Sequence, residues 1–530
     1  MKISYSIENL RSLTTAPKIE LRPITILVGR NSAGKSTFLR SFALLRQSLE
    51  AKSSAPILWY GDYVDFGDFS SAVNHASNSK EITFNFSAEK FSVSNRYQNY
   101  PLYYDDLIKV NSGRKSQEYS SINLSISLGE QMGRTVRRTV RLTDPSYGIS
   151  FVASFAKDGR NADSFVVNDA ELSVLLPNHS VIFTSSDIFS AGTLVTTVKA
   201  DSRQLRRIVN PAAAFASYIA GLVANFVDGR ILPPKIEAEA RRILQYPNLS
   251  PEALTILAST APAVSFRKLY DSLLRDDYKK LYKEINVACA MNYVLQAISD
   301  AGGFLERFFS QTTYLGPARA RSERYYRFQE LEISEIAPDG HNLPMFLGSL
   351  PPVQLRQFSE WVSGLFGFGV GVQRTEGHIS IQLKRDGLDV NAADTGYGVS
   401  QLLPVLAQIW WSSKTGARER RNSLYPITME QPELHLHPAH QAQLADALLN
   451  ALPNTQDDTR GSPVFVVETH SETLINRLGE LIEEGKLRAE DVQIVIFSSE
   501  DGNLNSTRIE TSNYDAEGVL ENWPFGFFSY

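Results

Sequence analysis

The chain has 530 residues, of which 43% are hydrophobic and 21% are charged, so its composition is globular and its length predicts more than one domain. The formal net charge of −5 excludes a protein that is basic throughout, and any contact with nucleic acid must come from a local patch. The single cysteine, Cys289, excludes a disulfide framework or a thiolate zinc site within one chain, which fits a reducing cytoplasm.

The N-terminal sequence MKISYSIENL lacks the basic start and apolar core of a signal peptide, and we expect a cytoplasmic protein. The longest apolar stretch, PAAAFASYIAGLVANFV at residues 211–227, is interrupted by Ser217 and Asn225. It is also short for a membrane span of about 20 residues. It predicts a buried helix, and we expect no contact with a membrane.

Residues 1–50 predict strand, turn, strand, loop and helix in that order. The apolar run ITILVG, residues 24–29, ends in glycine and is typical of a buried strand. The segment KSTFLRSFALLRQSLE then places four apolar residues on one face of a helix, namely Phe38, Phe42, Leu45 and Leu49.

Two different patterns follow. Between about Lys80 and Val198, segments such as EITFNFS and TVRRTVRL alternate apolar and polar residues and predict antiparallel strands. Between about Ser202 and Ser310, segments such as RKLYDSLLRDDYKKLYKEI and MNYVLQAISDAGGFLERFF predict amphipathic helices. Short buried strands and helices then return. We therefore predict an α/β fold split by a long insertion, with an N-terminal lobe at 1–80, a β-rich arm at 81–200, a helical insertion at 201–312 and a C-terminal lobe at 313–530.

The segment GRNSAGKS, residues 29–36, matches the phosphate-loop pattern G-x-x-x-x-G-K-[ST] at every required position. It follows the predicted buried strand and opens the predicted helix, which is the arrangement that the pattern requires. Backbone amides of such a loop and the positive end of the helix dipole bind phosphate. Lys35 should reach the β- and γ-phosphates of ATP, and the Ser36 hydroxyl should bind Mg²⁺. The predicted phosphate-binding residues are Asn31, Ser32, Ala33, Gly34, Lys35, Ser36 and Thr37.

A phosphate loop needs a second strand that ends in a carboxylate beside the metal. The segment LYPITME ends in Glu430, which predicts the second Mg²⁺ ligand at the carboxyl edge of the sheet. The next strand, PVFVVETH, ends in Glu468 and His470, and a histidine there could touch the γ-phosphate or its attacking water. His435 and His437 in ELHLHP could instead form a metal pair, but no third ligand lies close in sequence.

Four segments, GRNSAGKST, GYGVSQLLPVL, MEQPELHLHPAHQAQLAD and VETHSETLINRL, resemble the ABC-type P-loop ATPase heads of the AAA and OLD-like group, which are relatives of SMC proteins. The tail EGVLENWPFGFFSY is similar to that of one subset, which includes the ATPases of Septu (PtuA-like) and retron antiphage systems. The resemblance covers roughly residues 20–75 and 310–530 and leaves the insertion unassigned.

This resemblance implies roles for single residues. Lys35 and Ser36 look like the Walker A pair, and Glu430 looks like the Walker B carboxylate that holds Mg²⁺. Ser400 is similar to the serine of a signature motif, which completes the ATP site across a dimer. His470 looks like the switch histidine of the group.

Gln431 falls where the hydrolytic members of this group place the catalytic glutamate. A glutamine orients water but cannot accept its proton at neutral pH. We therefore expect slow turnover, or a different base such as Glu433 or Glu468. The predicted catalytic residues are Gln431, Glu433 and His470.

Two groups of arginines are open to more than one interpretation. The segment YLGPARARSERYYRF could be a phosphate-binding edge for ATP or nucleic acid, or a solvated face; its arginines are Arg319, Arg321, Arg324 and Arg327. In GRTVRRTVRL, Arg137 and Arg138 fall on opposite sides of a predicted strand, which favours a surface strand.

The segment after His470 is too short for the TOPRIM nuclease domain of OLD-like nucleases, and we find no HNH pattern.

We expect the ATP-binding subunit of a bacterial antiphage complex, a homodimer or higher homo-oligomer around ATP and Mg²⁺. It would regulate a separately encoded effector, an HNH-type nuclease (PtuB-like), with retron RNA or DNA, or phage DNA, as a further candidate partner. Three alternatives stay open: a nucleotide-sensing scaffold without turnover, an SMC-like DNA repair ATPase, and a transporter ATPase. The insertion disfavours the second because it lacks sustained heptads, and its length disfavours the third.

Overall fold

The computed structural model of the chain describes residues 2–15, 17–51, 53–94, 120–156, 158–183, 187–200, 203–330, 333–419, 423–453, 461–500 and 503–523. The chain forms two compact units. Unit 1 comprises Met1–Ser6, Ser53–Ile57 and Lys80–Glu306, and unit 2 comprises Ile7–Lys52, Leu58–Ser79 and Arg307–Tyr530. Strand β1 (Lys2–Leu10) and helix α8 (Lys279–Ser310) each contribute residues to both units.

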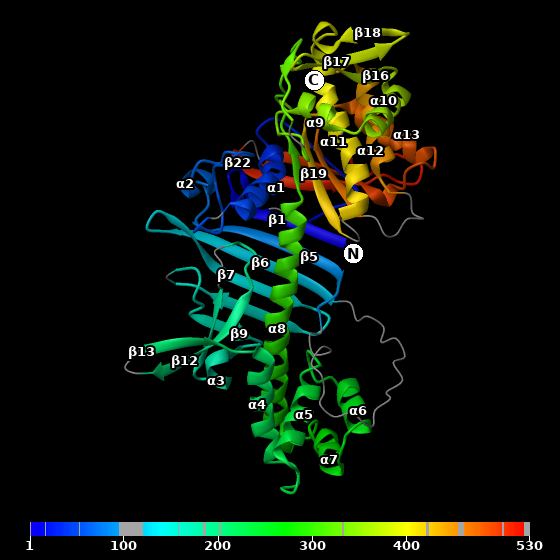
Figure 1. The fold of residues 1–530 in the computed structure, drawn as a ribbon. Coiled ribbons are helices and arrows are strands. Elements are labelled where there is room, and N and C mark those ends of the chain that lie inside the picture. The colour runs from blue at the N-terminus through cyan, green and yellow to red at the C-terminus, as the bar shows by residue number, and fades with distance from the viewer. Residues whose placement is uncertain are drawn as a thin grey trace. The chain divides into compact units, whose positions relative to one another are not determined.

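Unit 2 is built around a sheet in the order β14-β19-β20-β4-β21-β22. Figure 1 labels two of its strands, β19 and β22. The first five strands are parallel to their neighbours, and β22 pairs antiparallel with β21 at the edge. The strands predicted at ITILVG, LYPITME and PVFVVETH are confirmed, and they meet in this one sheet. Its strands are β14 (Thr313–Leu315), β19 (Leu424–Glu430), β20 (Ser462–Glu468), β4 (Ile24–Gly29), β21 (Val492–Glu500) and β22 (Asn503–Ser512).

Helices cover both faces of this sheet, which is why its central strands are apolar throughout. Alternate residues of β4, namely Ile24, Ile26 and Val28, join a core cluster with side chains of five helices. Those helices are α9 (Leu343–Ser349), α10 (Pro352–Phe366), α11 (Tyr397–Glu419), α12 (Pro438–Ala451) and α13 (Glu472–Glu483). Helix α1 (Lys35–Glu50) packs on the opposite face, and twelve of its 16 residues are buried, so the prediction of a single apolar face is too narrow.

The remaining elements of unit 2 are smaller. A second sheet has the order β15-β17-β16, and β18 pairs with β17. Trp523 of the segment EGVLENWPFGFFSY packs against the core cluster, and residues 524–530 of that segment lie outside the described residues. The bounds are β2 (Leu13–Thr15), β3 (Ile19–Glu20), α2 (Phe69–Ala72), β15 (Tyr326–Arg327), β16 (Gly369–Thr375), β17 (His378–Arg385) and β18 (Leu388–Asn391).

Unit 1 begins as an antiparallel meander, in which consecutive strands from β5 to β10 are neighbours. This confirms the predicted antiparallel strands. A smaller sheet follows in the order β11-β12-β13. The bounds are β5 (Ile82–Phe91), β6 (Ser120–Gln131), β7 (Arg134–Asp144), β8 (Ile149–Ser154), β9 (Ser164–Val167), β10 (Ala170–Glu171), α3 (Leu172–Leu175), β11 (His179–Phe183), β12 (Gly192–Ala200) and β13 (Arg203–Ile208).

Arg137 and Arg138 of β7 have different surroundings, as their alternation predicts. Arg137 is 2% exposed, whereas Arg138 is partly exposed. The guanidinium of Arg137 donates to the carbonyl oxygens of Gly159 and Asp187 at 2.8 and 2.6 Å. The expectation of a plain surface strand is therefore wrong for one side of β7, which carries a buried cation.

Helices α4–α7 gather around the first part of α8 (Figure 1). Their bounds are α4 (Pro211–Ala224), α5 (Pro233–Ile243), α6 (Pro251–Ser259) and α7 (Val264–Ser272). The apolar stretch at residues 211–227 forms α4, which is capped by the side chain of Asn210 and is only partly buried. In the part of the chain that the structure describes, no helix has the length and apolarity needed to cross a membrane.

The last two predicted helices of the insertion are divided differently in the structure. Helix α7 ends at Ser272, and α8 begins at Lys279 and runs without a break to Ser310. Asp276 and Asp277 lie just before α8, where their charges favour the positive end of its dipole. A prediction based on periodicity missed this restart because both helices share one apolar pattern.

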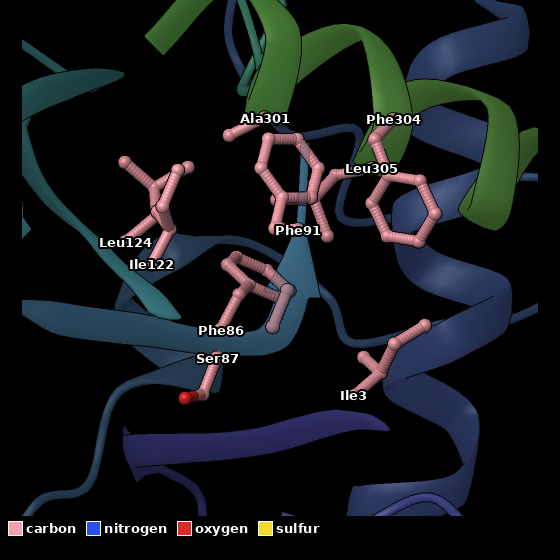
Figure 2. Close-up of a pocket in the computed structure, with 10 residues that line it drawn as sticks. Ile3, Phe86, Ser87, Phe91, Ile122, Leu124, Ala301, Phe304 and Leu305 are labelled. Atoms are coloured by element: carbon pink, nitrogen blue, oxygen red, sulfur yellow. The ribbon is translucent and has the colours of Figure 1, made fainter. Parts of the chain in front are cut away.

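Figure 2 shows a cavity of unit 1 that is lined by apolar side chains from β5, β6 and α8 and by Ile3. Its volume is about 20 Å³, room for about one water molecule. Ser87, a polar residue of the lining, donates its hydroxyl to Oδ1 of Asn123 at 2.7 Å and leaves the cavity itself apolar. The cavity is therefore a packing space and not a ligand site.

Candidate ATP-binding site

Strand β4 and helix α1 hold the phosphate loop between them. Gly29 ends β4 with a φ of 145°, and a Cβ there would lie 2.1 Å from the carbonyl oxygen of Phe497 in β21. Gly34 precedes α1 with a φ of 97°, and no side chain caps this helix. Backbone amides in the first turn of a helix have no acceptor one turn earlier, and amides of this kind bind phosphate.

Lys35 and Ser36 begin α1 and contact Glu468, which ends β20. The Nζ of Lys35 donates to the carbonyl oxygens of Gly29 and Arg30 at 2.8 and 2.9 Å and lies 3.9 Å from Oε1 of Glu468. The Ser36 hydroxyl donates to Oε2 of Glu468 at 2.7 Å. Burial lowers the pKa of Lys35, and the charge of Glu468 opposes that shift. An ammonium, a hydroxyl and a carboxylate thus converge at the carboxyl ends of β4 and β20.

The other predicted loop residues differ in exposure. Asn31 and Ser32 are exposed, and Ser32 has a positive φ of 64°. Ala33 and Thr37 are 5% and 9% exposed. The loop therefore presents its outer edge to solvent and keeps its inner side chains packed, as a loop that binds through its backbone requires.

Glu430 ends β19 and lies opposite Glu468 in the sheet register. Its Oε1 and Oε2 accept from the Arg40 guanidinium at 2.7 and 2.8 Å, and Oε1 also accepts from the Tyr314 hydroxyl at 2.8 Å. In this structure the Ser36 hydroxyl therefore bonds to Glu468 and not to the predicted carboxylate. Arg40 was missed in the sequence, although it lies one helical turn after Ser36 on the same face of α1.

Gln431, Glu433 and His470 lie on the loops that follow β19 and β20. Gln431 has a φ of 44°, and its N–H donates to the carbonyl oxygen of Glu468 at 2.8 Å. Oε1 of Glu433 accepts from the N–H of His470 at 2.8 Å, while its buried Oε2 has no partner among the described residues. Burial raises the pKa of Glu433 and lowers that of His470. Such a carboxylate is chemically better suited to take up a proton than an amide.

Ser400 lies in the first turn of α11 and is 5% exposed. Its hydroxyl donates to the carbonyl oxygen of Tyr397 at 2.7 Å, so the exposed group at this helix end is the Tyr397 side chain. A Cβ at Gly398 would lie 2.8 Å from the carbonyl oxygen of His435, which brings α11 close to the loop after β19. The Tyr397 and His435 rings pack edge to face with centroids 4.8 Å apart.

Arg319, like Arg40, contacts the site in a way that the sequence did not reveal. It is 4% exposed, and its Nη2 donates to the carbonyl oxygen of Glu430 at 2.8 Å. Its Nε and Nη1 have no partner in the described part of the chain, and burial lowers its pKa to about 10. Gln401 of α11 accepts from the N–H of Arg319 at 3.2 Å and donates to its carbonyl oxygen at 2.9 Å. The solvated-face interpretation is therefore wrong for Arg319, whereas Arg321, Arg324 and Arg327 are exposed.

The side chains at this edge fit Mg²⁺ bound together with a nucleotide. The Ser36 hydroxyl and Glu468 carboxylate supply oxygen atoms 2.7 Å apart. Mg²⁺ in such sites takes one or two protein oxygens and completes its shell with phosphate oxygens and water, and it neutralises phosphate charge. Within the described ranges, no three His, Cys, Asp or Glu side chains gather into a metal site of their own. These side chains therefore suit a metal ion that binds together with the phosphates of a nucleotide.

The phosphate loop at the carboxyl ends of parallel strands, with carboxylates ending the neighbouring strands, defines a P-loop ATPase fold of the α/β class. The family described as the AAA ATPase domain matches residues 1–137 and 347–475, just over half of the chain, and the chain belongs to this family. The predicted fold class, with an ATPase head split in sequence, is confirmed. Residues 138–346 and 476–530 lie outside the match.

Solved structures of SMC head domains are similar to the chain at low identity. One bound to the C-winged helix domain of ScpA is 10% identical over 96% of both chains, with a TM-score of 0.34. A Pyrococcus furiosus head with an extended coiled coil is 12% identical over 96% of this chain and 95% of that one, with a TM-score of 0.32. The Thermotoga maritima head is 10% identical over 96% and 97%, with a TM-score of 0.30. TM-scores this low carry no argument about function. No curated protein matches the chain in sequence.

Proposed function

We propose that this AAA ATPase binds Mg²⁺-ATP, dimerises around it and uses the dimer to control a separately encoded effector. The convergence of Lys35, Ser36 and Glu468 at one sheet edge carries the nucleotide-binding part of the proposal. The start of α11 supports the dimeric part, because its exposed Tyr397 could meet the nucleotide of a second copy. In such a dimer the seven loop residues and Ser400 would surround ATP.

Turnover would be slow, since Gln431 stands beside β19 where a carboxylate base would act. His470 would contact the γ-phosphate, and Glu433 would be the reserve base because its pKa is raised by burial. A nucleotide-sensing scaffold without turnover is the second candidate function, and the amide at Gln431 is the observation that favours it.

The effector would be an HNH-type nuclease (PtuB-like) of a bacterial antiphage system, acting in the cytoplasm. The support for this part is the resemblance of the tail EGVLENWPFGFFSY to Septu and retron ATPases. Retron RNA or DNA, or phage DNA, is the candidate trigger. An SMC-like repair ATPase is the alternative function. The identity of the genes adjacent to this one distinguishes it from the antiphage function.

The nucleotide-binding part is tested by Lys35→Ala, with Lys283→Ala as a matched control on the exposed side of α8. Charge-assisted contacts to phosphate are strong. Lys35→Ala should therefore weaken Mg²⁺-ATP binding by at least about tenfold in calorimetry, or about 1.4 kcal/mol, and abolish ATP-dependent dimerisation in light scattering. Lys283→Ala should behave as the unmodified chain. Equal affinities in the three proteins would remove the phosphate-loop assignment.

The effector part is tested by nuclease assays on the purified chain. With Mg²⁺-ATP alone it should not degrade plasmid, single-stranded DNA or tRNA. Co-expression with the product of the adjacent gene should yield a stable complex that cleaves nucleic acid, or that is held inactive until triggered. Metal-dependent cleavage by the chain alone, lost on a point mutation in unit 1, would make it a self-contained nuclease.

A further inference from the structure

The two carboxylates that end β19 and β20 have different partners. Glu430 is 2% exposed, and the Arg40 guanidinium binds it with two hydrogen bonds of 2.7 and 2.8 Å. The Tyr314 hydroxyl adds a third at 2.8 Å. Both oxygens of Glu430 are thus engaged by an internal cation and a phenol, and a metal ion there would have to displace the guanidinium.

Glu468 is 4% exposed and lies on the strand between β19 and the phosphate-loop strand β4. Its Oε2 accepts from the Ser36 hydroxyl at 2.7 Å, and its Oε1 lies 3.9 Å from Nζ of Lys35. It is paired in the sheet with Leu27, two residues before the end of β4. Glu468 is therefore the carboxylate that lies against the groups that begin α1.

We propose that Glu468 is the metal-binding carboxylate of this site, and that Glu430 is a positioning residue held by Arg40. This rests on the proposed binding of Mg²⁺-ATP. Mg²⁺ requires oxygen ligands, and the Ser36 hydroxyl and Glu468 carboxylate already lie within one hydrogen bond of each other. A dication beside Glu430 would be repelled by the Arg40 guanidinium, which stays protonated at any physiological pH.

The assignment separates the two carboxylates by function. Arg40 lies on α1, the helix that also carries Lys35 and Ser36. The two hydrogen bonds from its guanidinium to Glu430 connect that helix to the end of β19. Glu430 would orient α1 against the sheet, and Glu468 would supply negative charge to the metal. The resemblance to Walker B motifs assigns the metal to Glu430 instead. The two assignments therefore predict opposite results for Glu468→Gln and Glu430→Gln, because each assignment expects a different one of them to lose the metal.

The experiment uses Mn²⁺ as the probe, because its electron paramagnetic resonance reports free and bound metal without any turnover. The full chain with saturating ADP is titrated with Mn²⁺, in unmodified form and as Glu468→Gln, Glu430→Gln and the exposed control Glu472→Gln. Glu468→Gln should weaken Mn²⁺ binding by at least about tenfold, and Glu430→Gln should change it by less than about threefold. The control should match the unmodified chain.

Fluorescent ATP binding in EDTA is measured on the same proteins and separates the two possible failures. If no protein binds the nucleotide, the proposed function fails before the metal is considered. If nucleotide binding is kept and Glu430→Gln is the variant that loses Mn²⁺, the assignment of Glu468 is overturned. Glu468→Asp controls for a folding defect, since it keeps the negative charge at this position. It should retain more Mn²⁺ affinity than Glu468→Gln. Equal losses of Mn²⁺ affinity in the two variants would contradict the proposal.

Discussion

Replacing Arg137 by methionine should destabilise unit 1, because this guanidinium fills a buried polar position. Arg137 donates to two backbone carbonyls and lies over the Phe155 and Phe183 rings at 5.7 and 5.0 Å. The substitution leaves the buried carbonyl oxygen of Gly159 without the Arg137 donor, which costs about 1–3 kcal/mol, whereas the carbonyl oxygen of Asp187 still accepts from the N–H of Ser190 at 3.0 Å. The lost cation–π contacts cost about 1 kcal/mol. Removing a buried charge, whose pKa is lowered to about 10 and whose Nε has no partner among the described residues, offsets part of this.

The net loss should be about 1–3 kcal/mol, which corresponds to a fall of roughly 2–12 °C in the melting temperature of a unit of this size. Scanning calorimetry of the full chain measures it, with Arg141→Met as the control at an exposed position of the same strand. Arg141→Met should stay within about 0.5 kcal/mol of the unmodified chain. A shift for Arg137→Met no larger than the control's would refute the view that this cation is structural.

Three further outcomes are expected. Gly29→Ala would place a Cβ 2.1 Å from the carbonyl oxygen of Phe497, so it should lose ATP binding and at least about 2 kcal/mol of stability. Gly364→Ala in α10, where the Cβ meets no atom within 4 Å, should be neutral or stabilising by about 0.5–1 kcal/mol; similar melting temperatures for the two would contradict this. Gln431→Glu should raise the ATPase rate by at least about tenfold, and an unchanged rate would mean that another base already serves. Gln401→Leu removes two hydrogen bonds that tie α11 to the site, so it should weaken ATP-dependent dimerisation by about tenfold while monomeric ATP binding stays within about twofold. Unchanged dimerisation in light scattering would exclude this coupling.

The phosphate loop could be predicted from the sequence because it is local. A buried strand, a glycine-rich turn and a helix follow one another within residues 24–50, and the structure has each of them at the predicted bounds. The strands that end in Glu430 and Glu468 were predictable too, because short apolar runs ending in polar residues are typical of parallel strands. The order of those strands was not predictable, since pairing depends on contacts across the whole chain.

The partners of the site residues could not be read from the sequence for the same reason. Arg40 meets Glu430 and Gln401 meets Arg319 across long stretches of chain, and no periodicity links either pair. Exposure was misjudged where tertiary packing overrides local pattern. Arg319 sits in a segment that is rich in exposed arginines, yet it alone of the four is buried.

The placement of β4 has a consequence for how the protein is made. This strand leaves the ribosome long before its two neighbours, β20 (Ser462–Glu468) and β21 (Val492–Glu500), are translated. At about 5–20 residues per second, the apolar strand waits tens of seconds for its partners. Unit 1, whose meander pairs consecutive strands, can fold in that interval. A nascent chain therefore carries an unpaired hydrophobic strand and an unformed phosphate loop until β20 and β21 have emerged, and we expect it to depend on chaperones that shield such strands.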